Sequence, residues 1–131
     1  MNYIPPFVAI KEHVRIVTVH GERRVELSYD ELQQMIRVML AGLQVDEAWY
    51  LARYEDVAAG IRDGTIASAK EHFIDHGYFE GRQPFAMAVD ERWYLSTYAD
   101  VAEHVRQGAF PNGQHHFDAS GYREGRLPRA L

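Results

Sequence analysis

The sequence contains no cysteine, which excludes disulfides, thiolate zinc sites and cysteine nucleophiles. It also has no basic excess: 14 Lys and Arg stand against 19 Asp and Glu, giving a net charge of −5. This balance argues against duplex nucleic-acid binding and gives no attraction to anionic membranes. No run approaches the roughly 20 apolar residues of a membrane span. The N-terminal segment MNYIPPFVAIKEH has neither a basic start nor a long apolar stretch, so we expect no secretory signal and a cytoplasmic location.

Patterns that indicate catalysis are also missing. The glycines do not form a phosphate-cradling loop, no serine lies in a nucleophile elbow, and the acidic residues do not follow calcium-loop spacing. The adjacent carboxylates Asp46–Glu47 and Asp90–Glu91 stand where helices are expected to begin. We therefore predict a protein that is not an enzyme and uses no cofactor.

The chain does contain an internal repeat. Residues 45–84 and 89–128 align without a gap at an offset of 44, and 20 of the 40 aligned positions are identical. Residues that match between copies usually serve the fold of the repeated unit. We therefore expect the matched side chains to be structural, and any special role to belong to residues outside the repeat.

Each repeat is predicted to contain three short helices. In the first copy, Asp46 is the expected cap of the first helix, and the second begins near Asp56 and ends at Gly64. The third spans about 67–76, and equivalent helices are expected 44 residues later. The repeats are about 40 residues each, at the limit of what folds alone, and a short apolar linker (85–88) joins them. We expect them to pack together as one compact unit.

The N-terminal part, 1–44, carries a different pattern. Residues 1–12 are predicted to form an irregular arm. The β-branched segment 13–20 and the alternating segment 23–27 predict a hairpin with a turn at Gly21-Glu22. Because an isolated hairpin is unstable in water, we expect it to pack on a helix.

The helix predicted after the hairpin spans 29–42. Ser28 and Glu31 form a capping-box pattern at its start, apolar residues recur every three or four positions, and Gly42 suits its exit. The predicted fold is therefore mainly α. An N-terminal β-hairpin and amphipathic helix (1–44) precede two packed three-helix repeats (45–84 and 89–128).

The repeat has a recognisable consensus: W-Y-L-x-x-Y-x-D-V-A, then H-F, then G-Y-x-E-G-R-x-P. This consensus resembles a short tandem repeat found as an accessory module in bacterial polysaccharide-related glycosyltransferases and large surface proteins. Many relatives have proline before the aspartate of D-V-A, where this chain has Glu55 and Ala99. The resemblance implies a non-catalytic unit in a bacterium, associated with surface-polysaccharide production.

The first predicted strand is apolar on both faces, and this suggests an interface. Val14 and Ile16 lie on one face, and Val17 and Val19 on the other. A two-sided apolar strand favours self-association or pairing with a partner protein. We therefore predict a protein-interaction or assembly module that binds another protein or forms a homo-oligomer, without nucleic-acid binding or membrane insertion.

An alternative is carbohydrate binding through repeat residues. The candidate ligand contacts are Tyr50, Tyr94, Arg82 and Arg126, together with the neighbouring tryptophans. The competing interpretation is that the aromatic rings are core residues and that each arginine bridges to the matched Asp56 or Asp100.

Two further hypotheses receive less support from the sequence. His72 and His76 have helical i, i+4 spacing near Glu71 and Asp75, a pattern compatible with metal binding or a small enzyme, but two histidines do not complete a zinc site. His72 has a counterpart in His116, and we interpret both as core histidines, which predicts no metal. A DNA-binding regulator is disfavoured by the negative charge.

Overall fold

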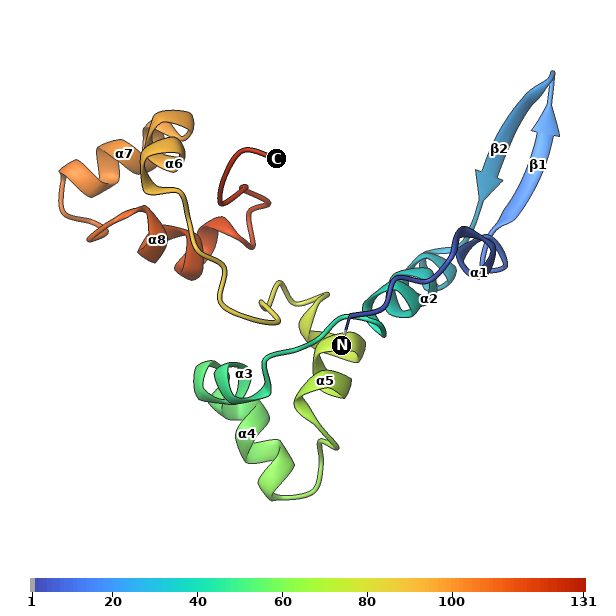
Figure 1. Ribbon diagram of the computed structural model, residues 1–131, viewed down its shortest axis with the longest axis horizontal. Coiled ribbons are helices and arrows are strands. Elements are labelled where there is room, and N and C mark those ends of the chain that lie inside the picture. Colours follow the sequence, from blue (N-terminus) through green and yellow to red (C-terminus); the bar gives the residue numbers. More distant parts are fainter. Residues whose placement is uncertain (1) are drawn as a thin grey trace. The chain divides into compact units, whose positions relative to one another are not determined.

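The computed structural model describes residues 2–131, and 50% of the chain is helical, with one small antiparallel hairpin (Figure 1). The mainly α fold class with an N-terminal hairpin is thus confirmed. The chain divides into two units, one ending at His76 and one spanning Gly77–Leu131. Each is described separately, and the predicted packing of the two repeats against each other stays a prediction.

Residues 2–12 are not irregular throughout, because they contain helix α1, Phe7–Lys11. The preceding stretch is tied to the end of the next long helix: the Tyr3 amide donates to the Gly42 carbonyl at 2.7 Å, and the Gln44 amide donates to Asn2 Oδ1 at 2.8 Å. Gly42 is required for this contact, since a Cβ there would lie 1.8 Å from the Tyr3 carbonyl oxygen. The prediction of an irregular arm was therefore wrong over α1.

Strands β1 (Arg15–Val19) and β2 (Glu22–Glu26) form the hairpin, with Val17 opposite Arg24 and Ile16 opposite Val25. The turn is His20-Gly21, one residue earlier than predicted. Both turn residues have positive φ, 51° and 76°, as a tight two-residue hairpin requires.

The expected packing of the hairpin on a helix is not found. No residue of either strand is buried, and Val17 alone is half-buried. Two adjacent strands satisfy each other's backbone on one side without any helix. Burial of their side chains therefore needs a surface that the described part of this chain does not supply.

Helix α2 (Tyr29–Leu40) begins with the predicted capping box. The Glu31 amide donates to Ser28 Oγ, and the Ser28 amide donates to Glu31 Oε1, each at 3.1 Å. The last turn of α2 and the residue Leu43 pack on the core of the first repeat. No residue of α2 is buried.

The two repeats fold alike. In the first copy the elements are α3 (Glu47–Arg53), α4 (Glu55–Arg62), α5 (Ala69–His72) and the π-helix η1 (Phe73–Gly77). In the second they are α6 (Glu91–Thr97), α7 (Ala99–Arg106), α8 (Gly113–His116) and the π-helix η2 (Phe117–Gly121). The third predicted helix of each copy is thus an α turn followed by a π turn.

Matched residues build both cores. The buried apolar residues of the first copy include Tyr50, Val57 and Phe73, and those of the second are their counterparts Tyr94, Val101 and Phe117. The predicted aspartate caps are also confirmed: Asp46 accepts from the Trp49 amide and Asp90 from the Trp93 amide, both at 3.1 Å. Gly64 and Gly108 have φ of 83° and 81°, the left-handed conformation expected after a helix.

Candidate interaction surface

The most distinctive polar contact of each repeat lies inside it. Tyr50 Oη is 2.9 Å from His72 Nδ1, and Tyr94 Oη is 2.8 Å from His116 Nδ1. Both tyrosines are 0% exposed, so their rings are not available to stack on a sugar. The structure therefore contradicts Tyr50 and Tyr94 as ligand-binding residues, because each aromatic ring fills the core of its own repeat.

The electrostatics of the second copy fit this structural role. Burial raises the pKa of Tyr94 to about 12. Burial first, and then the positive charge of Arg126, lower the pKa of His116 below its usual 6.5. Tyr94 Oη and His116 Nδ1 share one buried hydrogen bond, and the imidazole tautomer sets which of the two groups donates.

Arg126 is also held by its own repeat. Its guanidinium donates two hydrogen bonds to the Asp100 carboxylate, at 2.8 and 2.7 Å, and its Nε donates to Glu124 at 2.7 Å. It lies 4.9 Å from the centroid of the Tyr98 ring. These bonds lower the pKa of Asp100 and raise that of Arg126. The predicted bridge from Arg126 to Asp100 is confirmed, and the guanidinium is committed to an internal network.

The matched Arg82 has a similar local partner. Its Nε donates to Glu80 at 2.8 Å, and 21% of its side chain is exposed. An arginine that is mostly covered and ion-paired is a poor candidate for capturing a ligand unless that pair is broken.

The histidine pair of the first copy does not gather a ligand set. The rings of His72 and His76 lie 5.8 Å apart between centroids, but His72 is engaged with Tyr50. Within residues 2–131, no group of three or more histidine, aspartate and glutamate side chains is placed to hold a metal ion.

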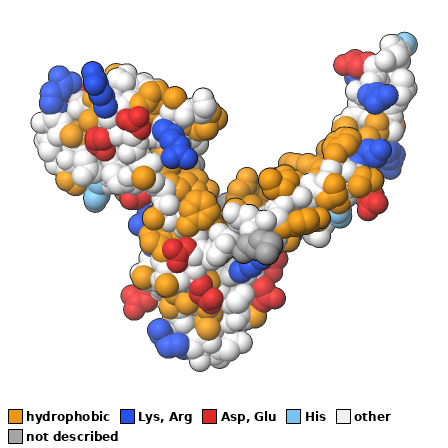
Figure 2. Space-filling view, viewed as in Figure 1, with side chains coloured by type: hydrophobic (Ala, Val, Ile, Leu, Met, Phe, Trp, Pro, Cys, Tyr) orange, Lys and Arg blue, Asp and Glu red, His pale blue; other side chains and the backbone are white. Residues whose placement is uncertain are grey.

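The apolar side chains that remain exposed are concentrated in the N-terminal segment, residues 2–44. Figure 2 shows hydrophobic side chains spread over α1 and α2 and reaching toward the hairpin. The large exposed hydrophobic residues of this segment are Tyr3, Ile4, Phe7, Val8, Ile16, Val19, Val25, Tyr29, Leu32 and Met39. A run of this kind along one short segment indicates an interaction surface.

The four predicted interface residues belong to this N-terminal surface. Ile16 is 42% exposed and Val19 is 39% exposed, while Val14 and Val17 are half-buried. Ile16 faces Val25 across the hairpin, so this side carries an apolar cross-strand pair. Val17 and Val19 lie on the opposite side, beside the charged residues of β2. The alternation that the sequence predicted is therefore present.

The four predicted interface residues do not include Phe7, Val8 and Val25, which are more exposed than any of the four. A signal for them existed: Phe7 and Val8 follow two prolines, a position from which a helix often begins, and Val25 lies in an alternating strand. What the sequence could not give is their exposure, because an apolar residue in a short element is usually expected to be buried.

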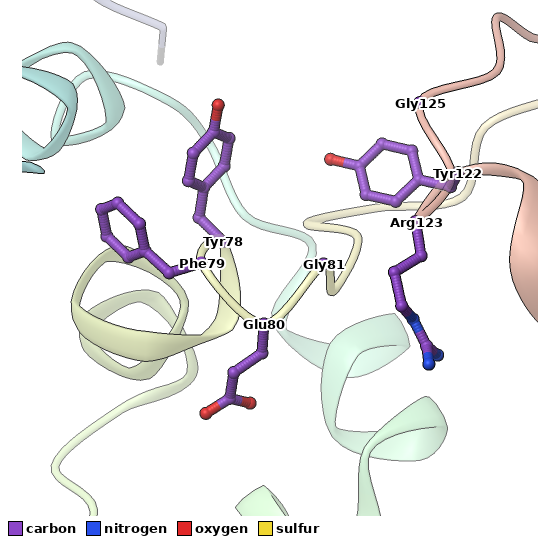
Figure 3. Close-up of a pocket in the computed structure, with 7 residues that line it drawn as sticks. All are labelled: Tyr78, Phe79, Glu80, Gly81, Tyr122, Arg123 and Gly125. Carbon is purple, nitrogen blue, oxygen red and sulfur yellow. The ribbon is translucent and has the colours of Figure 1, made fainter.

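A shallow pocket of about 650 Å³ lies in the second unit (Figure 3). Tyr78 and Tyr122 stand on opposite sides of it, and Glu80 and Arg123 supply charge near its rim. The two tyrosines occupy matched positions of the Gly-Tyr-x-Glu-Gly-Arg turn. They were not among the predicted ligand residues, because residues matched between the copies were expected to be structural.

Comparison with models of protein families, with curated proteins and with solved structures finds no match in any of the three. None of the helices over residues 2–131 has the length and apolar character needed to cross a bilayer. The function must therefore be argued from the surface of this chain.

Proposed function

We propose that this chain is a non-catalytic protein-interaction and assembly module, cytoplasmic in location. The N-terminal segment makes the contact, and the helical repeat provides a folded base for it. The observation that carries the proposal is the contrast in burial. The repeat residues Tyr50, Tyr94, Arg82 and Arg126 are engaged within the repeats, whereas α1, α2 and the hairpin leave large apolar side chains in solvent.

The first step of the argument is energetic. Each square ångström of apolar surface removed from water contributes roughly 25 cal/mol, so side chains such as Phe7, which is 75% exposed, have unused stabilisation to contribute to a complex. The second step is structural. An isolated two-stranded hairpin is marginal in water, and a partner that covers it would stabilise it.

The biological context is carried by the repeat consensus alone. Its resemblance to accessory repeats of polysaccharide-related glycosyltransferases and surface proteins supports a role in assembling bacterial proteins of surface-polysaccharide production. Such a role needs a binding surface and a stable scaffold, without a reaction centre.

Site-specific photo-crosslinking of the full chain tests the proposal. A benzophenone side chain is placed at Phe7 or Val25 in one set of variants, and at Leu127 as an exposed control in a repeat. We expect adducts in the host cell from the two N-terminal positions and few from Leu127. Equal labelling at all three, or labelling at Leu127 alone, would overturn the assignment of the contact to the N-terminal segment.

A second candidate function, carbohydrate binding, is favoured by the pocket between Tyr78 and Tyr122. Paired aromatic rings with a nearby carboxylate and guanidinium are suited to sugar recognition. Titration calorimetry with glucose, mannose and N-acetylglucosamine oligosaccharides tests it. Binding that is lost in Tyr78→Ala and kept in Tyr29→Ala supports this function, and no heat of binding with any of the sugars refutes it.

A further inference from the structure

The hairpin has two edges, and the backbone register shows what each offers. The two-residue turn follows Val19 and precedes Glu22, so Arg15, Val17 and Val19 direct their N–H and C=O groups toward β2. The backbone groups of Ile16 and Thr18 consequently point to the outer edge of β1. Within residues 2–131 no further strand joins this sheet.

We infer that the partner of the β1 edge is a second copy of the same chain, paired antiparallel about Val17. This inference rests on the proposed function and names its partner. With Val17 opposite Val17 of the other copy, Ile16 of each chain stands opposite Thr18 of the other. These are the two residues whose backbone groups point outward, so they can exchange about four hydrogen bonds.

The charges on the strands select β1 over β2 for this contact. Antiparallel pairing of β1 with itself over its full length brings together Arg15 with Val19, Ile16 with Thr18, and Val17 with Val17. No like charges meet, and the valines and isoleucines gain neighbours.

The same full-length pairing of β2 with itself is repulsive. It places Arg24 opposite Arg24 of the other copy and Glu22 opposite Glu26 at both ends. Like charges directly opposite one another destabilise a sheet. The charged edge strand β2 therefore protects its side of the hairpin against further addition, and the assembly closes as a two-fold dimer.

The product is a four-stranded sheet in the order β2, β1, β1 and β2, with a two-fold axis at Val17. On one side, each Ile16–Val25 pair continues into Thr18 and Arg23 of the other copy, and the two isoleucines are diagonal neighbours. On the other side, Val17 and Val19 of both copies lie together at the centre. A sheet of four strands with apolar side chains is large enough to be stable in water, whereas a lone hairpin is not.

Cysteine substitution gives a direct test, because the natural chain has none. In the full-length Val17→Cys variant, the two new thiols of a dimer face each other at a non-hydrogen-bonded pair, where Cβ atoms are about 4.5–5.5 Å apart. The matched control is Arg24→Cys, since Arg24 is the cross-strand neighbour of Val17 on the same side of the hairpin. In the proposed sheet the two Arg24 positions are separated by two intervening strands, too far apart for a disulfide.

Under mild oxidation with glutathione we expect a disulfide-linked dimer of Val17→Cys on a non-reducing gel, and monomer for Arg24→Cys. Light scattering of the natural chain should give twice the 15.1 kDa monomer mass, and Val17→Lys should halve that mass with unchanged helical circular dichroism. Val17→Thr, which keeps β propensity, should retain the dimer.

The inference is overturned if the natural chain is monomeric or forms open-ended polymers, or if both cysteine variants crosslink equally. It is also overturned if Val17→Lys keeps the dimer mass. If photo-crosslinking at Phe7 and Val25 still gives adducts while these tests fail, the proposed function stands and the partner is another protein. If neither set of experiments gives a product, both proposals fail.

Discussion

The Tyr94–His116 contact gives the sharpest prediction about what holds a repeat together. Tyr94→Phe removes the hydroxyl that lies 2.8 Å from His116 Nδ1 and leaves the ring in place. Tyr94 is 0% exposed and His116 is 4% exposed, so water does not readily replace the lost hydroxyl as a hydrogen-bond partner. A buried polar atom without a partner costs about 1–3 kcal/mol, which we expect as the loss in free energy of unfolding.

The loss should be visible as a lower melting temperature. For a domain of this size, each kcal/mol lowers the midpoint by roughly 4–8 °C. The chain has only two tryptophans, Trp49 and Trp93, one in each unit. In a Trp49→Phe background, Trp93 fluorescence during urea unfolding therefore reports on the unit that contains Tyr94.

Two variants calibrate this measurement. Tyr29→Phe removes a hydroxyl from a side chain that is 70% exposed, and we expect no measurable change. Tyr50→Phe removes the equivalent bond to His72, which is only partly buried, so a smaller loss is expected in the first unit. If Tyr94→Phe costs no more than Tyr29→Phe, the hydroxyl contributes nothing and the structural role assigned to the pair is wrong.

Three further predictions concern the same repeat. His116 has a lowered pKa in the folded state, so it binds protons more readily when the chain is unfolded. The free energy of unfolding should therefore be constant above about pH 7 and fall as the pH drops below 6.5. Urea midpoints would show this slope, which should disappear in His116→Asn. Gly121→Ala should cost about 1–3 kcal/mol in unfolding free energy, because its Cβ would lie 2.3 Å from Tyr94 Oη; an unchanged urea midpoint would contradict this packing. Asp100→Asn breaks the ion pair with Arg126, but since the carboxylate is exposed, the expected loss in free energy of unfolding is below about 1 kcal/mol. A loss well above about 2 kcal/mol would show that the network stabilises the repeat more than its exposure suggests.

Local rules predicted much of the secondary structure. Ser28 with Glu31, and Asp46 with its counterpart Asp90, are caps whose chemistry needs only four consecutive residues to be in place, and all form as expected. Gly64 was likewise predictable, since a left-handed residue after a helix favours glycine.

What failed to follow from the sequence depends on distant contacts or on small differences in hydrogen bonding. Helix α1 has five residues, too few for a periodic pattern, and Tyr3 before it is positioned by Gly42. The π turn at Phe117–Gly121 differs from an α turn by one residue in each bond: the Tyr122 amide donates to the Phe117 carbonyl, five residues back. Hydrophobic spacing over five residues does not distinguish the two.

The candidate interaction surface was predicted only in part, because the sequence shows which residues alternate along a strand and does not show which of them are buried. The two apolar faces of β1 could be read from alternation, and Val17 and Ile16 do lie on opposite sides. For Tyr50 and Tyr94 the sequence left two roles open, ligand contact and core residue, and their burial decides for the core. Sequence alone does not show whether a tyrosine hydroxyl meets water or a histidine. Once the His72 and His116 partners are known, repetition at the same offset explains all four residues.

Duplication separates two kinds of mutational effect in this chain. Tyr94, Val101 and Phe117 are buried and each has a buried counterpart in the other copy, so substituting them changes stability first and any activity second. Phe7 and Val17 have no counterpart and are not buried, so their substitution should leave unfolding free energy nearly unchanged while altering association. This follows because a side chain that is still hydrated in the folded chain gives up its water only in the complex. The stabilisation it provides therefore appears in the dissociation constant and not in the unfolding midpoint of the separate chain.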